Sequence, residues 1–180
     1  MEINKQIMDE VNWTNVSDSW STKRRTRLTY VDLFSGAGGI SKGFEMAGMA
    51  GVYGLDHFDS AVETYANNFD HPIFHGDIRL SKVKDEFVEL VNKKLLGRKL
   101  NILAGGFPCQ GFSMSGHRVV SDPRNTLYLD MLEIVSFLQP DFVVLENVVG
   151  LRSLLQGGVE QKIINDYMAY GYDINVTTLH

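Results

Sequence analysis

The sequence predicts an α/β fold with a doubly wound, mostly parallel sheet. Short apolar runs rich in Val, Ile, Leu, Phe and Tyr alternate along the chain with longer stretches in which apolar residues recur at helical spacing. The runs indicate buried strands, and the stretches indicate amphipathic helices. Alternation of this kind is typical of βαβ units, whose parallel strands are joined by right-handed crossovers. With 180 residues, 44% of them hydrophobic, the chain is long enough to bury one core.

Five strands and one further candidate are predicted from the apolar runs. Ligands bind outside the carboxyl ends of such strands, where the strand order reverses, so chemistry-bearing residues should follow the strands directly. The five strands are expected at Leu28–Phe34, Gly51–Leu55, Ile73-Phe74, Leu100–Ala104 and Phe142–Leu145. The further candidate is Asp173–Thr178.

Helices are predicted where apolar residues share one face, and each of them would connect two strands. The first helix should begin near Ile40, directly after a glycine-rich turn. The other helical faces are Ala61, Val62, Tyr65, Ala66 and Phe69; Phe87, Leu90, Val91 and Leu95; Leu127, Met131, Ile134, Val135 and Leu138; and Ile163, Ile164, Tyr167 and Met168.

Composition and charge exclude several classes of protein. The net charge of −5 argues against a chain that holds nucleic acid by bulk electrostatics, so any DNA contact must be local or supplied elsewhere. Cys109 is the only cysteine, which excludes a disulfide framework and a cysteine-rich zinc site and fits a reducing cytoplasm. No apolar run reaches the roughly 20 residues that span a bilayer, and no secretion signal is evident at the N-terminus. Residues 1–27 are predicted to be a polar extension and residues 28–180 the folded domain.

A glycine-rich turn follows the first strand. Its sequence is Asp32-Leu33-Phe34-Ser35-Gly36-Ala37-Gly38-Gly39. Glycine lets the backbone turn sharply and approach a ligand, and the amides of a helix N-terminus favour a negative group, so a nucleotide-like cofactor is the expected occupant. Position 41 is serine where the dinucleotide-binding pattern has its third glycine, and a plain strand-to-helix connection is the alternative.

Acidic residues follow the next two strands. Asp56 ends the second strand, where doubly wound folds commonly place a carboxylate on ribose hydroxyls, and the alternative is an N-cap ahead of a helix at Ser60–Asn68. Asp77 follows Ile73-Phe74 and could reach an adenine amino group, or it is an ordinary turn residue. Together with the glycine turn, Asp56 strengthens the nucleotide interpretation.

Cys109 and Glu146 follow the fourth and fifth strands. A lone cysteine is commonly a packing residue, but Cys109 lies between Pro108 and a polar, glycine-containing loop at the predicted ligand-binding edge. This position favours a nucleophile. Glu146 comes directly after four apolar residues at the same edge, and a structural salt bridge is its alternative role.

Three sequence blocks resemble the cytosine C5 DNA methyltransferases of bacterial restriction-modification systems. They are the glycine turn, the block Gly106-Phe107-Pro108-Cys109-Gln110-Gly111-Phe112-Ser113 and the block Glu146-Asn147-Val148, in the family's order and spacing. Weaker matches are Asp56, Gly76-Asp77-Ile78 and Asn125-Thr126-Leu127-Tyr128. The resemblance covers about Leu28 to His180 and implies the Rossmann-like fold of the S-adenosylmethionine-dependent methyltransferases.

The resemblance also implies roles for the matching residues. Cys109 would add to C6 of cytosine, Glu146 would assist at N3, and residues 110–124 would close over a base flipped out of duplex DNA. Phe34 would pack on the adenine of S-adenosylmethionine, and Asp56 would take its ribose hydroxyls. The implied catalytic set is Phe107, Pro108, Cys109, Gln110, Glu146 and Asn147. The implied cofactor-binding set is Phe34, Ser35, Gly36, Ala37, Gly38, Gly39, Asp56, His57, Asp77, Ile78 and Leu127.

The chain departs from the family's pattern in two ways. Family members usually carry glutamate at the position of Asp56 and often a large apolar or aromatic residue at that of His57. Beyond the last strand candidate the family continues with a segment carrying glutamine and two arginines, a target-recognition domain and a final segment that returns to the cofactor pocket. We therefore expect a catalytic and cofactor-binding part, truncated at its carboxyl side, that is inactive alone. It would act on double-stranded DNA with the missing part supplied in cis or as a second polypeptide, and it could self-associate through an exposed sheet edge.

Three other functions remain open from the sequence. A relative that methylates RNA would use the same thiolate chemistry. A non-catalytic module would fold and bind cofactor without transferring a methyl group. An NAD-dependent oxidoreductase would explain the glycine turn and Asp56 but would leave Cys109, Glu146 and Ser41 unexplained.

Overall fold

The computed structural model describes residues 27–108 and 127–179 of the chain. Within these residues, five parallel strands form one sheet in the order β3-β2-β1-β4-β5. The strands are β1 (Thr29–Leu33), β2 (Ala50–Asp56), β3 (Ile73–His75), β4 (Ile102–Gly105) and β5 (Phe142–Leu145). Because β1 pairs with both β2 and β4, the strand order reverses between β1 and β4. The prediction of a doubly wound parallel sheet is confirmed.

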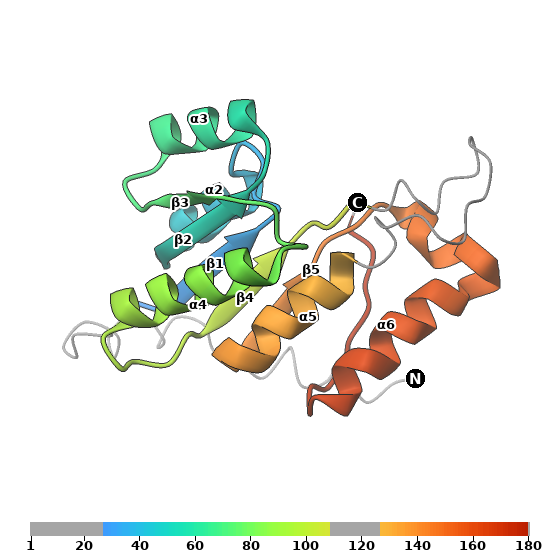
Figure 1. Ribbon diagram of the computed structural model, residues 1–180. Coiled ribbons are helices and arrows are strands. Elements are labelled where there is room, and N and C mark those ends of the chain that lie inside the picture. The colour runs from blue at the N-terminus through green and yellow to red at the C-terminus, as the bar shows by residue number, and fades with distance from the viewer. Residues whose placement is uncertain (1–26, 109–126, 180) are drawn as a thin grey trace, which may run out of the picture.

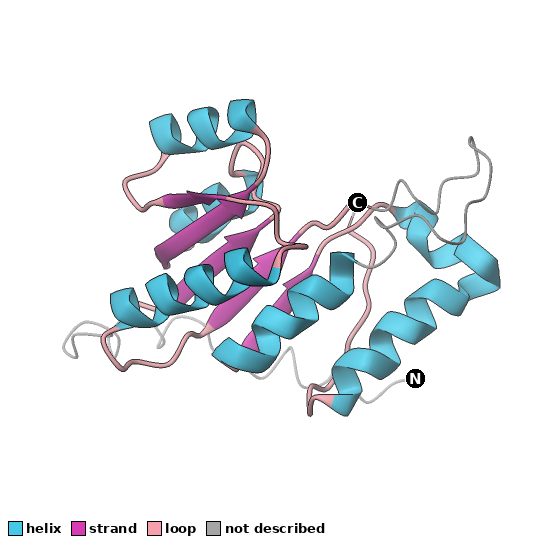
Figure 2. Cartoon of the chain, viewed as in Figure 1, coloured by secondary structure: helices cyan, strands magenta, loops and turns pink. Residues whose placement is uncertain are grey.

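Helices cover both faces of this sheet, which forms the middle layer of the molecule (Figures 1 and 2). In the view of Figure 1, α4 and α5 lie on the near face, and α2 lies behind the sheet. The helices are α2 (Gly39–Met46), α3 (Asp59–Asn68), α4 (Ser81–Leu95), α5 (Leu127–Leu138) and α6 (Gly158–Ala169), and a 3-10 helix, η5 (Val149–Gly157), precedes α6. Among the described residues, no helix is long and apolar enough to cross a bilayer.

The central strand β1 is buried on both faces, which explains its continuous apolar run. All five of its residues are buried. Val31 and Leu33 pack into the main apolar cluster together with residues of α4 and α5. Tyr30 faces the opposite layer, with its ring centroid 5.0 Å from that of Phe44 in α2. β1 therefore lies between two packed layers, and the glycine turn follows at its carboxyl end.

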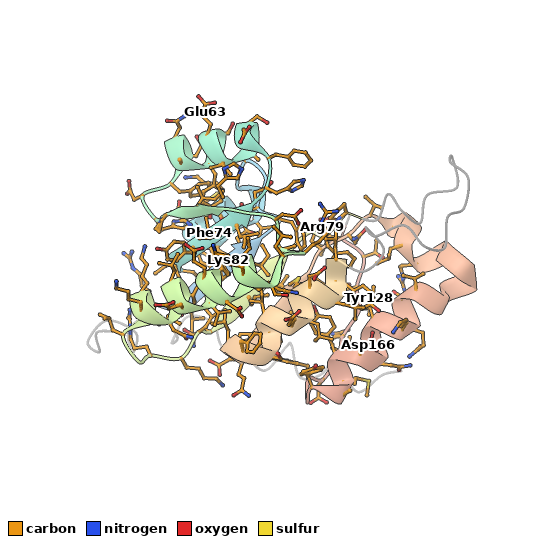
Figure 3. The ribbon with its side chains drawn as sticks, in the orientation of Figure 1. Glu63, Phe74, Arg79, Lys82, Tyr128 and Asp166 are labelled. Atoms are coloured by element: carbon orange, nitrogen blue, oxygen red, sulfur yellow. The ribbon has the colours of Figure 1, made fainter. Side chains whose placement is uncertain are left out.

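Polar side chains join neighbouring helices at the edge of the core. The buried Lys84 ammonium of α4 donates to Asp130, over 3.0 Å, and to Glu133, both in α5. The Tyr128 hydroxyl of α5 donates to Asp166 of α6 over 2.8 Å, and Figure 3 shows these two side chains reaching toward each other. These contacts connect α4 to α5 and α5 to α6.

The prediction of a strand at Asp173–Thr178 is wrong. This segment is irregular, and most of its residues are exposed. It makes no ladder with the described strands, and side-chain contacts hold it instead. Arg152 donates to the Thr178 hydroxyl over 3.1 Å, and the Tyr172 hydroxyl donates to the carbonyl oxygen of Pro140 over 2.9 Å. Alternating apolar residues are insufficient for a strand where no neighbouring backbone pairs with them.

Candidate active site

A cavity of about 470 Å³ lies at the carboxyl ends of the strands, next to the point where the strand order reverses. Its lining combines aromatic, acidic and backbone groups from the segments that follow β1, β2, β3 and β4 and from the start of α5. The lining residues are Phe34, Gly36, Leu55, Asp56, His57, Phe58, Gly76, Asp77, Ile78, Arg79, Gly106, Pro108 and Leu127. The structure therefore brings together eight residues that sequence analysis assigned to the site, from five separate segments.

The glycine turn adopts a backbone that requires glycine at Gly38. The φ angle of Gly38 is +96°, and a Cβ at this position would lie 2.1 Å from the Phe69 ring and 3.1 Å from the Tyr65 ring. Phe34 also has a positive φ, of 55°, which is unusual for a residue with a large side chain. The turn therefore places Phe34 and Gly36 on the cavity wall, while Gly38 lies buried against α3.

Three further residues assigned to the cofactor by sequence analysis lie in this turn but do not line the cavity. Ala37 and Gly39 are exposed, and Ser35 is buried. Within the described part of the chain, the Ser35 hydroxyl has no hydrogen-bond partner. A buried hydroxyl without a partner is costly, so a ligand or an ordered water is the expected acceptor or donor here.

The Asp56 carboxylate ties the glycine turn to the start of α3. Its Oδ2 accepts a hydrogen bond from the Gly36 amide over 2.8 Å, and its Oδ1 accepts one from the Phe58 amide over 3.0 Å. The N-cap of α3 is Phe58, so the simple N-cap alternative for Asp56 does not apply. Each oxygen of a carboxylate can accept a second hydrogen bond, so Asp56 retains the capacity to bind a ribose hydroxyl.

Asp77 is engaged by a residue that sequence analysis did not single out. Arg79 donates to Asp77 Oδ1 from its amide and its Nε, over 3.0 and 2.9 Å, and to Oδ2 from its Nη2 and its Nε, over 2.5 and 3.1 Å, so each oxygen already has two contacts. The hydrogen bonds from Arg79 hold the pKa of Asp77 below its ordinary value. Figure 3 shows Arg79 in the connection between β3 and α4. To accept a hydrogen bond from an adenine amino group, Asp77 would have to release one of these contacts.

Two exposed aromatic rings follow Asp56 at the cavity wall. The His57 and Phe58 rings have centroids 3.8 Å apart, and the Phe58 side chain is largely exposed. The sequence resemblance implies a cofactor role for His57 but none for Phe58. The available signal was an aromatic pair directly after a strand that ends in an acid.

The ends of β4 and β5 meet beside the cavity. The Asn147 side-chain amide donates to the carbonyl oxygen of Phe107 over 2.8 Å, and Phe107 itself is buried. The Glu146 carboxylate lies against Gly106, where a Cβ would be only 3.0 Å from its Oε2. Cys109 and Gln110 belong to residues 109–126, which lie outside the described residues. The structure describes the segment that leads to Cys109 as far as Pro108.

Glu146 makes no ion pair with the residues that the structure describes. Its amide donates to the Gly105 carbonyl over 3.1 Å, which fixes its backbone beside β4, and its side chain is exposed. The structural salt bridge considered as its alternative role is thus not found within these residues.

Comparisons with known proteins agree on one family. Residues 28–180 match the family model of the C-5 cytosine-specific DNA methylases. The chain is 38% identical to the Type II methyltransferase M.HindV of Haemophilus influenzae over 83% of this chain and 46% of that protein. It is 41% identical to the Type II methyltransferase M.HgiGI of Herpetosiphon aurantiacus over 68% of this chain and 91% of that protein. The chain spans about half the length of M.HindV and of several other curated relatives.

Solved structures give the same fold. A prophage-encoded DNA modification methyltransferase from E. coli matches with a TM-score of 0.63 at 32% identity, over 79% of this chain and 38% of that one. A short-chain dehydrogenase from Streptomyces avermitilis matches with a TM-score of 0.56 at 12% identity, over 81% of this chain and 59% of that one. At this low identity the second likeness shows a shared fold alone.

Proposed function

Since the chain belongs to the C-5 cytosine-specific DNA methylase family, we propose that it forms the cofactor-binding and catalytic part of an enzyme that methylates C5 of cytosine in duplex DNA. One observation carries the proposal. The cavity that contains Phe34, Asp56 and Asp77 extends to Pro108, the residue before Cys109. A cofactor in this cavity and a nucleophile at Cys109 would therefore serve one reaction centre.

The family implies S-adenosylmethionine as the cofactor, and the residues present fit it. A cavity of about 470 Å³ is within the usual range for ligand sites. Phe34 offers a ring face for the adenine, and Asp56 offers acceptor capacity for the ribose hydroxyls. The Asp56 carboxylate also suits a ligand that carries positive charge, whereas the charge of Asp77 is paired with that of Arg79. When bound, this cofactor supplies an electrophilic methyl carbon on a sulfonium sulfur.

Cys109 would activate the cytosine ring by covalent addition. Cytosine C5 is a poor nucleophile, and a thiolate that adds to C6 turns C5 into an enamine-like carbon. C5 would then take the methyl group that the bound cofactor supplies, and the electron pair of the broken carbon–sulfur bond would stay with the cofactor. A base removes the C5 proton, and the electron pair of that C–H bond restores the C5–C6 double bond and expels the thiolate. Cys109 thus returns to its starting state.

Glu146 would relieve the charge that this addition places on the ring. A carboxyl group at N3 that donates a proton or a hydrogen bond stabilises the adduct. The position of the Glu146 carboxylate at the end of β5, against Gly106 on the cavity wall, supports this role. Asn147, which holds the Phe107 carbonyl, would orient the segment that leads to Cys109.

Transfer to DNA would require more than the described core. The target base must leave the stack to reach Cys109, and the net charge of −5 does not favour phosphate binding. The edge strand β5 exposes Phe142 and Val144 on one face, with 63% and 40% of their surfaces accessible. A carboxyl-terminal part, in cis or as a second polypeptide, would cover this apolar edge and supply the DNA contacts. Without that part, two copies of the chain would associate through the exposed edge of β5.

The proposal is tested by measuring transfer of labelled methyl groups from S-adenosylmethionine to duplex DNA. The chain is assayed alone, and then with a polypeptide that carries the carboxyl-terminal half of a relative such as M.HindV. We expect transfer only in the mixture, and none with Cys109→Ser, whose cofactor affinity should stay within about threefold of the parent. Methylation of transfer RNA in place of DNA, or full turnover by Cys109→Ser, would contradict the proposal.

A further inference from the structure

A chain of buried polar side chains lies beneath the glycine turn. Ser41 donates to Asp32 Oδ2 from its hydroxyl over 2.7 Å and from its amide over 3.2 Å. The Tyr65 hydroxyl lies 2.6 Å from Ser41 Oγ and 2.7 Å from His71 Nε2. Asp32, Ser41 and Tyr65 are fully buried, and His71 is 8% exposed. This chain, called the Tyr65 network below, joins β1, α2, α3 and the segment before β3.

Three glycines, two of them in β2 and one in the glycine turn, make room for the rings of this network. A Cβ at Gly54 would lie 2.7 Å from the Tyr65 ring, and a Cβ at Gly51 would lie 2.4 Å from the His71 ring. Gly38, in the turn itself, approaches Tyr65 and its neighbour Phe69 as described above. Because the backbone of β2 and of the turn yields space to these rings, their positions are tightly fixed.

When Asp32 is ionised, the donor and acceptor roles of every group in the Tyr65 network are fixed. A carboxylate only accepts, so Ser41 must donate its single hydroxyl hydrogen to Asp32. Tyr65 must then donate to Ser41 Oγ, and His71 Nε2 must donate to the Tyr65 oxygen. Loss of the Tyr65 hydroxyl would leave the Ser41 oxygen without its donor and the His71 ring nitrogen without its acceptor, so that only the bond to Asp32 would hold the Ser41 hydroxyl.

The network also explains the serine that replaces the third glycine of the dinucleotide pattern. That glycine normally permits close packing of the first helix on the first strand. Here Ser41 occupies the position, and both its amide and its hydroxyl bind Asp32 on β1. These bonds join Asp32 and Ser41, the two residues that flank the turn 33–40. Gly38, within this turn, is the N-cap of α2.

We propose that the Tyr65 hydroxyl is a positioning group for cofactor binding: it holds Ser41 on Asp32 and thereby fixes the glycine turn that forms one wall of the cavity. The inference rests on the proposed function, since it names a residue that serves the same cofactor site. Tyr65 does not line the cavity, so it acts through Ser41 and Gly38. Its removal should loosen the turn while the cavity keeps all its lining residues.

Tyr65→Phe tests the proposal against a matched variant, Tyr128→Phe. The control removes the same hydroxyl from another buried tyrosine, which donates to Asp166 of α6 and does not belong to the Tyr65 network. Affinity for S-adenosylhomocysteine is measured by calorimetry, and amide hydrogen exchange is followed at residues 36–41. We expect Tyr65→Phe to weaken binding about fivefold or more and to speed exchange at these amides by a similar factor. Tyr128→Phe should leave both quantities within about twofold of the parent.

A second pair of variants separates positioning from general stability. His71→Gln keeps a side-chain nitrogen that can donate to Tyr65, whereas His71→Leu removes it. We expect His71→Gln to retain most of the affinity and His71→Leu to lose about as much as Tyr65→Phe. Equal affinity of Tyr65→Phe and the parent, or equal losses in Tyr65→Phe and Tyr128→Phe, would overturn the proposal. Failure of the parent chain to bind S-adenosylhomocysteine would instead refute the proposed function, and the inference with it.

Discussion

The side-chain amide of Asn147 donates a hydrogen bond to the carbonyl oxygen of Phe107 over 2.8 Å. This bond connects the end of β5 to the segment that follows β4, two residues before Cys109. Both segments lie at the carboxyl edge of the sheet, beside the cavity. The geometry of the segment that leads to Cys109 should therefore depend on Asn147.

Replacing Asn147 with Asp should slow methyl transfer. A carboxylate would face the Phe107 carbonyl where an amide donates now, so the segment before Cys109 should shift. We expect the transfer rate of the reconstituted enzyme to fall about tenfold or more, while affinity for S-adenosylmethionine changes less than about twofold. Asn165→Asp, on the exposed side of α6, is the control and should transfer at the parent rate. An unchanged rate for Asn147→Asp would show that the bond has no part in the reaction.

Glu146→Gln should slow transfer by a factor on the order of 10² or more, the range typical of a positioned acid or base. The amide keeps the shape of the side chain against Gly106 but supplies no proton to N3. Glu63→Gln is a matched control because Glu63 is exposed on the outer side of α3, away from the cavity (Figure 3). Single-turnover rates measure the effect, and a near-normal rate for Glu146→Gln would make Glu146 structural.

Gly38→Ala should destabilise the fold and impair the cofactor site together. The added methyl group meets the Phe69 ring, and the positive φ of Gly38 is unfavourable for alanine. We expect the free energy of unfolding, measured with urea, to fall by about 2–4 kcal/mol. Gly43→Ala is the control, since Gly43 lies in α2 with open space around its Cα, and it should stabilise the chain by up to about 1 kcal/mol. Equal stability of the two variants would contradict the close approach of α3.

Asp32→Asn should alter the pH dependence of stability. Burial raises the pKa of Asp32 from 3.8 to about 6, although the bonds from Ser41 oppose the shift. The folded state therefore binds the proton of Asp32 more tightly than the unfolded state does. Protonation of Asp32 thus stabilises the fold below about pH 4, and this stabilisation is lost as the pH rises to about 6. Relative to the parent, Asp32→Asn should therefore gain up to about 3 kcal/mol between about pH 4 and pH 7. Urea unfolding across this range checks the sign, and parallel pH profiles of the two proteins would contradict it.

The periodicity of apolar residues and the polar residues that directly follow the strands were sufficient to predict the sheet and most of the cavity. The run at Phe142–Leu145 forms β5 with the predicted bounds, and Asp56 and Pro108 meet at one cavity as expected. Local patterns do not reveal which distant groups bind each other, so the roles of Arg79 and Tyr65 could not be predicted. For the same reason Asp173–Thr178 was misassigned, because a strand depends on a neighbour that its own residues do not specify.

Calorimetric titration of the chain with S-adenosylmethionine and, separately, with NAD tests most directly whether the cavity is a methyltransferase cofactor site. We expect saturable binding of S-adenosylmethionine with a dissociation constant of about 1 mM or tighter, and no binding of NAD over the same range. Asp56→Ala should weaken the binding of S-adenosylmethionine, because it removes the acceptor that also holds the Gly36 amide. Saturable binding of NAD would contradict this expectation. So would the absence of any heat of binding with millimolar S-adenosylmethionine, for a chain whose circular dichroism shows an intact fold.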